Sequence, residues 1–171
     1  AQDRCMTDVL ELGRGSGIDV DALGDAASER LEAEACSLAS SIAAVTCRWL
    51  LVVGELDRRE TWRSWGCRGM GHWLAWKCGM ALGTARHHLD VARRLPELPR
   101  IQARFAAGTL SFSKVRALCR VATPETEAVL IELADSGTAA QLERMLTAYQ
   151  KAIDKAAASD RAADRHRALR V

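Results

Sequence analysis

A heptad pattern of apolar residues runs through the first third of the chain and limits how it can fold. From residue 31 to residue 56, alternating steps of four and three residues separate Leu31, Ala35, Leu38, Ile42, Val45, Trp49, Val52 and Leu56. This spacing places the eight side chains in one stripe along an α-helix and predicts a single helix over about residues 26–59. Leu50, Leu51 and Val53 widen the apolar side of this helix beyond the stripe, which favours burial on more than one face. Two interpretations remain open: a core helix of a bundle, or the contact face of a homodimer.

The rest of the sequence also favours an all-α protein. Ala is abundant, and β-forming residues never alternate over a useful length. With 171 residues, 49% of them apolar, the chain can bury one good core. We therefore predict a single helical domain over residues 19–158, in which the long helix packs on a bundle. Residues 1–18 are predicted to be flexible, and the charged residues 159–171 either extend the last helix or form a linker.

Residues 71–95 have the spacing of a helix-turn-helix. This motif needs a small residue where two helices cross and a Gly about four positions later, and Ala75 and Gly79 meet both demands. The first helix is predicted over residues 72–78, with Leu74 and Cys78 facing inward. The second helix has a buried stripe at Ala85, Leu89 and Ala92, and its outward face carries Arg86, His87, Asp90, Arg93 and Arg94. An ordinary hairpin of two helices has the same spacing and remains the alternative.

Positive charge is concentrated around this motif. Residues 58–120 hold 13 Lys or Arg against three acidic residues, whereas residues 1–57 hold 4 against 11 and residues 121–171 hold 7 against 8. The whole chain has a net charge of only +2. A basic segment between acidic ones is typical of a site for a polyanion, whereas a solvated helix face usually mixes both signs. The distribution favours nucleic-acid binding.

Capping residues mark the remaining helices. A short helix over 97–107 should follow the break at Pro96 and Pro99 and stop at Gly108. Three more helices are predicted. The first is capped by Ser111 and runs to about Ala122, and the second starts at Thr123 and Pro124 and ends near Ser136 and Gly137. The third opens with a capping box from Thr138 to Gln141 and runs through Lys155 or beyond.

Catalytic and metal-binding patterns are scarce. The six cysteines include no CxxC pair, so we expect buried thiols rather than structural zinc; the alternative is a metal site made by Cys67, His72 and Cys78. Ser113 and Lys114 resemble a Ser-Lys nucleophile, but Ser111 before them is better explained as a helix cap. We expect no enzymatic activity, no cofactor, no metal and no small-molecule ligand. No run of about 20 apolar residues and no apolar segment of signal-peptide type occurs, which favours a cytoplasmic protein without a membrane contact.

Four segments resemble one family. They are ELDRRETW (55–62), HWLAWKCGMALGTARHHLDVARRLPELP (72–99), FAAGTLSFSKVRALCRVATPETE (105–127) and TAAQLERML (138–146). By these segments, the chain from about Leu31 to Arg170 resembles the family called domain of unknown function 222, the 13E12-repeat family. Longer members of that family carry an HNH endonuclease motif downstream. The resemblance implies that this chain is similar to the targeting half of such nucleases.

A shorter segment resembles the DNA-binding core of the ParB partition proteins. The shared features are the run RRLPELP (93–99), the Gly-x-Leu-Ser segment at 108–111 and the basic helix from Ser113 to Arg120. Those proteins bind palindromic duplex DNA through a helix-turn-helix. The similarity implies contacts with bases or phosphates, and the DNA-binding residues predicted here are Lys77, Thr84, Arg86, His87, Arg93, Arg94, Lys114 and Arg116.

Two departures from the family pattern matter. Ala81 stands where the second helix usually has a capping residue, so the cap must come from Gly83 or Thr84. The nuclease motif is missing, because the chain contains no Asn and only four His.

We therefore predict a helical module that binds duplex DNA, which would place the protein at the bacterial nucleoid within the cytoplasm. The alternative is a protein-interaction or dimerisation module that acts through the heptad stripe without direct DNA contact. DNA binding should weaken steeply with salt and depend on Arg86 and Arg93. Partner binding should depend on Leu38, Ile42 and Val45.

Overall fold

The computed structural model describes the backbone of residues 23–168 and the side chains of residues 23–152 and 155. Residues 1–18, predicted to be flexible, lie outside this part. Within it the chain is helical and contains no strand, which confirms the all-α prediction. The elements in order are α3 (Ser28–Arg58), the 3₁₀ turn η1 (Thr61–Trp65), α4 (Met70–Lys77), α5 (Leu82–Arg94), the 3₁₀ turn η2 (Leu95–Glu97), α6 (Pro99–Ala106), α7 (Phe112–Cys119), α8 (Glu127–Asp135) and α9 (Ala139–Ala168).

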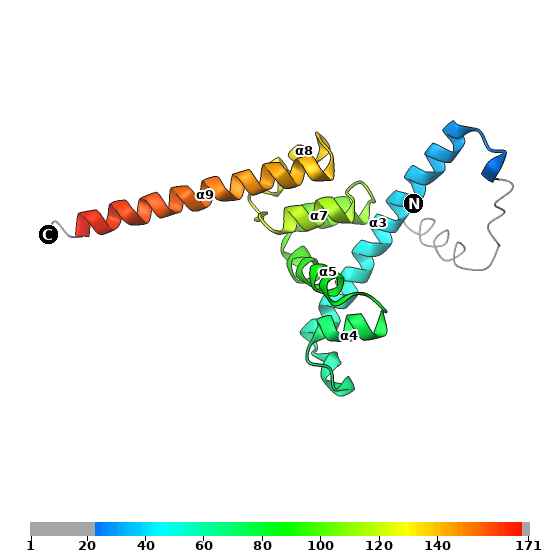
Figure 1. Ribbon diagram of the computed structural model, residues 1–171, viewed down its shortest axis with the longest axis horizontal. Coiled ribbons are helices and arrows are strands. Elements are labelled where there is room, and N and C mark those ends of the chain that lie inside the picture. The colour runs from blue at the N-terminus through cyan, green and yellow to red at the C-terminus, as the bar shows by residue number, and fades with distance from the viewer. Residues whose placement is uncertain (1–22, 169–171) are drawn as a thin grey trace.

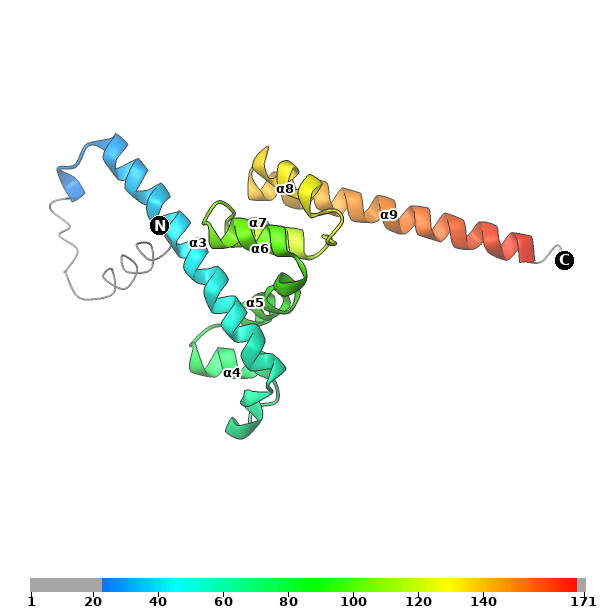
Figure 2. The ribbon, with the colours of Figure 1, turned by 180° about the vertical axis from the view of Figure 1, so that it is seen from behind.

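The helices form a small body from which two long helices project. The C-terminal half of α3 packs against α5 and α6, and α4 lies against α5 beside it (Figure 1). Seen from behind, α6 and α7 lie between α3 and the layer formed by α8 and α9 (Figure 2). The first turns of α3, before Ser40, extend beyond these contacts at one end of the molecule, and the C-terminal half of α9 extends beyond them at the other. The body therefore sits between the packed halves of these two helices.

The boundaries of α3 were predicted correctly to within two residues, but its buried face was not. The buried residues are Ala43, Cys47, Leu50 and Val53. The heptad stripe lies on a neighbouring side of the helix, and Ile42 in its middle remains 66% exposed. The stripe is therefore not the core face of the single chain, and of its residues only Trp49 and Leu56 pack partly against the core.

Small residues explain why α3 turns this other face to the body. A Cβ on Gly54 would lie 2.9 Å from the carbonyl oxygen of Ala92 in α5, and one on Gly108 would lie 2.4 Å from the carbonyl oxygen of Ser40. Only hydrogen fits at these distances, so α3 can approach α5 and the turn after α6 with backbone nearly touching backbone. The larger side chains of the stripe would hold those elements apart.

The core includes one buried carboxylate, that of Glu127 in α8. Its side chain is 1% exposed, and its carboxylate accepts hydrogen bonds from the backbone N–H groups of Ile101 at 2.9 Å and Arg100 at 3.3 Å. These N–H groups belong to the first turn of α6, where Leu98 as N-cap offers no side-chain acceptor. A residue 26 positions away in sequence thus caps α6, and negative charge there is favoured by the helix dipole.

Other predicted helix starts are confirmed where the capping residue and the N–H group that it binds lie within one turn of each other. The Ser111 hydroxyl accepts the N–H of Lys114, and Thr138 and Gln141 bond reciprocally as a capping box. The prediction that the next helix starts at Thr123 and Pro124 was wrong. The Thr126 hydroxyl accepts the N–H of Thr123 in a turn, and α8 begins only at Glu127.

By length and composition alone, α3 is apolar enough to cross a membrane. The core helix of a soluble protein meets the same criterion. Since α3 uses Leu50 and Val53 to pack against its neighbours, this property is weak support for a membrane segment.

Candidate nucleic-acid interface

The two helices predicted over residues 71–95 are present as α4 and α5, packed against each other. The turn between them contains Gly79 at φ 64°, the left-handed conformation for which Gly was expected. Leu74 of α4 is buried, as are Ala85, Leu89 and Ala92 of α5, so the predicted stripes are confirmed. Cys78 is exposed, and the prediction that it faces inward was wrong because α4 ends one residue before it.

The start of α5 is uncapped. Its N-cap is Ala81, which has no side-chain acceptor, so the predicted cap from Gly83 or Thr84 was wrong. The first N–H groups of a helix have no partner within the helix and carry its positive dipole end. Leu82, Gly83 and Thr84 at this end are exposed. The N–H groups at the helix start can therefore donate hydrogen bonds to an acceptor outside the chain, and an anion suits this position best.

A basic groove of about 570 Å³ lies between the start of α4 and one side of α5. We define it by four basic residues, Arg68, His72, Arg86 and Arg93, which line it together with Gly69, Met70, Gly71, Leu82 and Leu89. Arg93 donates a hydrogen bond to Asp57 at the end of α3 at 2.8 Å, and this bond raises the pKa of Arg93. Within the described part of the chain, the side chains of Arg68 and Arg86 have no ion-pair partner. These two guanidinium groups are the ones available to a ligand in the groove.

Arg94 has a structural role. Its guanidinium donates to the carbonyl oxygens of Ala122 at 2.8 Å and Cys119 at 3.5 Å, and it pairs with Glu97. It thereby satisfies carbonyl groups at the C-terminal end of α7, where a cation also suits the helix dipole. Its role as a DNA contact stays a prediction, and contact with DNA would compete with these bonds.

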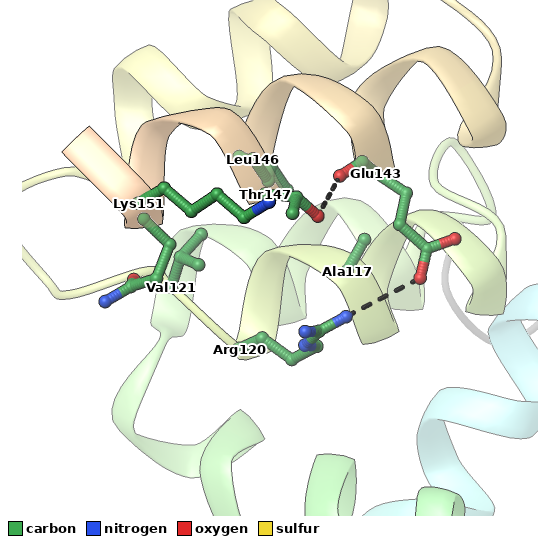
Figure 3. Close-up of a pocket in the computed structure, with 8 residues that line it drawn as sticks. Ala117, Arg120, Val121, Glu143, Leu146, Thr147 and Lys151 are labelled. Atoms are coloured by element: carbon green, nitrogen blue, oxygen red, sulfur yellow. Dashed lines mark hydrogen bonds and ion pairs between the residues drawn. The ribbon is translucent and has the colours of Figure 1, made fainter. Parts of the chain in front are cut away.

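The cations of α7 point toward α8 and α9. Lys114 donates to the carbonyl oxygen of Ala134 at 2.6 Å, near the end of α8. Arg116 and Arg120 both approach the carboxylate of Glu143 in α9, at 3.5 and 3.6 Å. Figure 3 shows Arg120 reaching Glu143 across a small hollow of about 140 Å³ between α7 and α9. Lys114 and Arg116 therefore have partners within the chain, and their contact with phosphate remains a prediction.

Part of the charge in the basic segment is neutralised in the same way. Glu55 near the end of α3 accepts hydrogen bonds from Arg58 and Arg59, which lower the pKa of its carboxyl to about 2. Arg104 pairs with Asp135 at 2.8 Å. Fewer positively charged side chains are therefore free of an ion-pair partner than the count of charged residues in the sequence suggests.

Lys77 at the end of α4 is held by two tryptophans. Its ammonium group lies 3.9 Å from the ring centroid of Trp65 and 4.2 Å from that of Trp76. Both rings remain 55% exposed. Sequence reasoning named Lys77 but missed these two residues, and their clustering near the basic segment was the available signal.

The two adjacent histidines of α5 differ in their surroundings. His87 is exposed, as is Thr84. His88, which sequence reasoning did not single out, stacks on Phe112 of α7 at 4.4 Å and meets Trp49 of α3 edge-on at 5.3 Å. Its Nδ1 donates to the carbonyl oxygen of Thr84 at 2.8 Å. His88 thus locks α5 between α3 and α7, while His87 faces outward.

The described residues contain no cluster of side chains suited to bind a metal ion. No three His, Cys, Asp or Glu side chains come together there to hold a metal ion. The buried thiol of Cys119 has its pKa raised to about 12 by desolvation, so it stays protonated and is a poor nucleophile.

Comparison with known proteins identifies a family. Residues 25–167 match the family described as Domain of unknown function (DUF222). No curated protein and no solved structure shows a significant match. The matched range includes α3 to α8 and nearly all of α9. The family description names no activity.

Proposed function

The chain belongs to the family of domain of unknown function 222 (DUF222), and on that premise we propose that it binds duplex DNA through α4 and α5. The family description assigns no activity, so the support comes from the residues. The sequence resemblance to the targeting half of HNH-type nucleases and to the ParB helix-turn-helix points in the same direction.

The observation that carries the proposal is the basic groove. Arg68 and Arg86 line it without an ion-pair partner in the described part of the chain, and it lies beside the exposed start of α5. Guanidinium groups bind phosphate in a bidentate manner, and backbone N–H groups at a helix start bind the same oxygens. A phosphate of the DNA backbone is the ligand that suits both.

In the proposed complex, α5 enters the major groove, as the second helix of this motif does. Arg68 and Arg86 each bind a backbone phosphate, and Thr84 and His87 face base edges. Phosphate contacts of this kind set the position of the protein, whereas contacts to base edges select a sequence. No catalytic step is part of the proposal.

Replacement of Arg86 with alanine is expected to weaken duplex binding about tenfold and to reduce the slope of log affinity against log salt by about one, because one phosphate contact is lost. Fluorescence anisotropy with a labelled duplex, measured across a salt series, gives both numbers. Arg144→Ala is the matched control, since Arg144 is also an exposed arginine without an ion-pair partner among the described residues, but it lies on α9 beside the turn from α8.

Two outcomes contradict the proposal. A chain that does not bind duplex DNA at low salt lacks the function altogether. Equal losses in Arg86→Ala and Arg144→Ala mean that binding follows net charge and not the groove.

A further inference from the structure

We infer that a second copy of this chain packs antiparallel against the heptad stripe of α3 and forms a symmetric homodimer. This inference does not rest on DNA binding. It starts from a contrast in the fold: α3 has a buried face made by Ala43, Cys47, Leu50 and Val53, whereas the stripe residues Leu38, Ile42, Val45 and Val52 beside that face are each at least 40% exposed. Two other stripe residues, Trp49 and Leu56, are partly buried against the core.

The stripe is an apolar surface on a projecting helix. Ile42 is 66% exposed, Val45 44% and Leu38 40%, and Val52 further along is 52% exposed. The first turns of α3, before Ser40, extend beyond the helices of the body (Figure 1). Contiguous apolar surface of this kind marks an interaction site on a soluble protein.

The spacing of the stripe specifies the kind of partner. Steps of four and three residues keep apolar side chains on one seam, and such a seam fits another helix with the same repeat, because knobs of one helix must fit holes of the other. A second α3 has that repeat by identity. The occupant that the stripe fits without any further assumption is therefore a copy of the chain itself.

Charges beside the stripe select the antiparallel orientation. Glu34 and Arg48 precede the stripe residues Ala35 and Trp49, so both occupy the flanking position from which coiled-coil helices form ion pairs. Both are exposed, and neither has an ion-pair partner among the described residues. If Leu38 of one copy lies opposite Ile42 of the other, Glu34 faces Arg48 of the second copy. The twofold axis repeats this pair, so the dimer contains it twice.

The same register matches the side-chain sizes. It places Ala35 opposite Val45 and Leu31 opposite Trp49 of the second copy, so a smaller side chain meets a larger one in these layers, whereas the central layers pair Leu38 with Ile42, which are of equal size. A parallel dimer instead places Ala35 opposite Ala35 and Trp49 opposite Trp49, and it leaves Glu34 and Arg48 opposite uncharged residues. Both packing and charge therefore favour the antiparallel form.

Sedimentation equilibrium of the purified full chain tests the inference. The wild type is expected to dimerise, and Ile42→Asp to weaken association at least about a hundredfold, because the symmetric contact then buries a carboxylate from each copy. Since Ile42 is mostly exposed in the single chain, this variant should still fold, which circular dichroism verifies. Val129→Asp is the matched control: Val129 is 67% exposed on α8, away from the stripe, and its replacement should not change association.

Charge reversal tests the orientation. Glu34→Arg and Arg48→Glu should each weaken the dimer a few-fold by placing like charges opposite each other, and the double variant should restore wild-type association because the pairs are rebuilt with their signs exchanged. A wild type that stays monomeric overturns the inference. A dimer that Ile42→Asp does not weaken also overturns it, and a double variant that is not restored overturns the antiparallel register.

Discussion

Replacing Gly108 with alanine is expected to lower the free energy of unfolding by about 2 to 5 kcal/mol, although it adds only one methyl group. Two costs combine at this position. Gly108 has φ 73°, a left-handed conformation in which an L side chain is strained. In addition, the new Cβ would lie 2.4 Å from the carbonyl oxygen and 2.9 Å from the carbonyl carbon of Ser40, which is backbone of α3 and cannot rotate away.

Gly79→Ala separates these two costs. Gly79 has a similar φ of 64°, but a Cβ there would meet nothing within 4 Å. This control should lose only about 1 to 2 kcal/mol, the conformational cost alone. Urea unfolding followed by tryptophan fluorescence measures both variants. Equal losses of unfolding free energy in Gly108→Ala and Gly79→Ala would mean that the close approach of α3 to the turn after α6 does not contribute to the effect of Gly108→Ala.

Glu127→Ala is expected to destabilise the chain by about 3 kcal/mol. The substitution removes the buried acceptor for the N–H groups of Arg100 and Ile101, and it leaves a cavity beside α6. Glu127→Gln should lose less, because the amide oxygen can still accept a hydrogen bond. The same unfolding experiment measures both.

Glu132→Ala is the control for this prediction. Glu132 lies on the same helix, α8, but its side chain is exposed. Its removal should change stability by less than about 0.5 kcal/mol. If Glu127→Ala and Glu132→Ala unfold at the same urea concentration, the carboxylate of Glu127 does not cap α6.

Helix positions were predictable from sequence where the signal is local. The limits of α3 follow from the periodicity of apolar residues, and the starts of α7 and α9 follow from Ser111 and Thr138, whose hydroxyls bond within one turn. The left-handed turns at Gly79 and Gly108 were predictable for the same reason. Each of these signals involves residues within a few positions of each other.

Partners across the fold were not predictable. Sequence reasoning treated Arg93, Arg94, Lys114 and Arg116 as outward cations, whereas each has a partner on another element or across a loop. It did not find Glu127 either, because its role depends on a helix start 26 residues away. A sequence shows that a residue is charged, but only packing shows which groups of opposite charge or dipole come within reach.

The two faces of α3 divide what sequence and tertiary structure each decided. Periodicity by itself determined that residues near 28–58 form one long helix with an apolar seam, because a helix repeats every 3.6 residues whatever surrounds it. It could not determine which face is buried, because α3 carries two adjacent apolar faces. That choice was made by Gly54 and Gly108, which let α5 and the turn after α6 approach the side of α3 that carries Cys47 and Leu50. Burial is a property of pairs of surfaces, and so only the tertiary structure decided it.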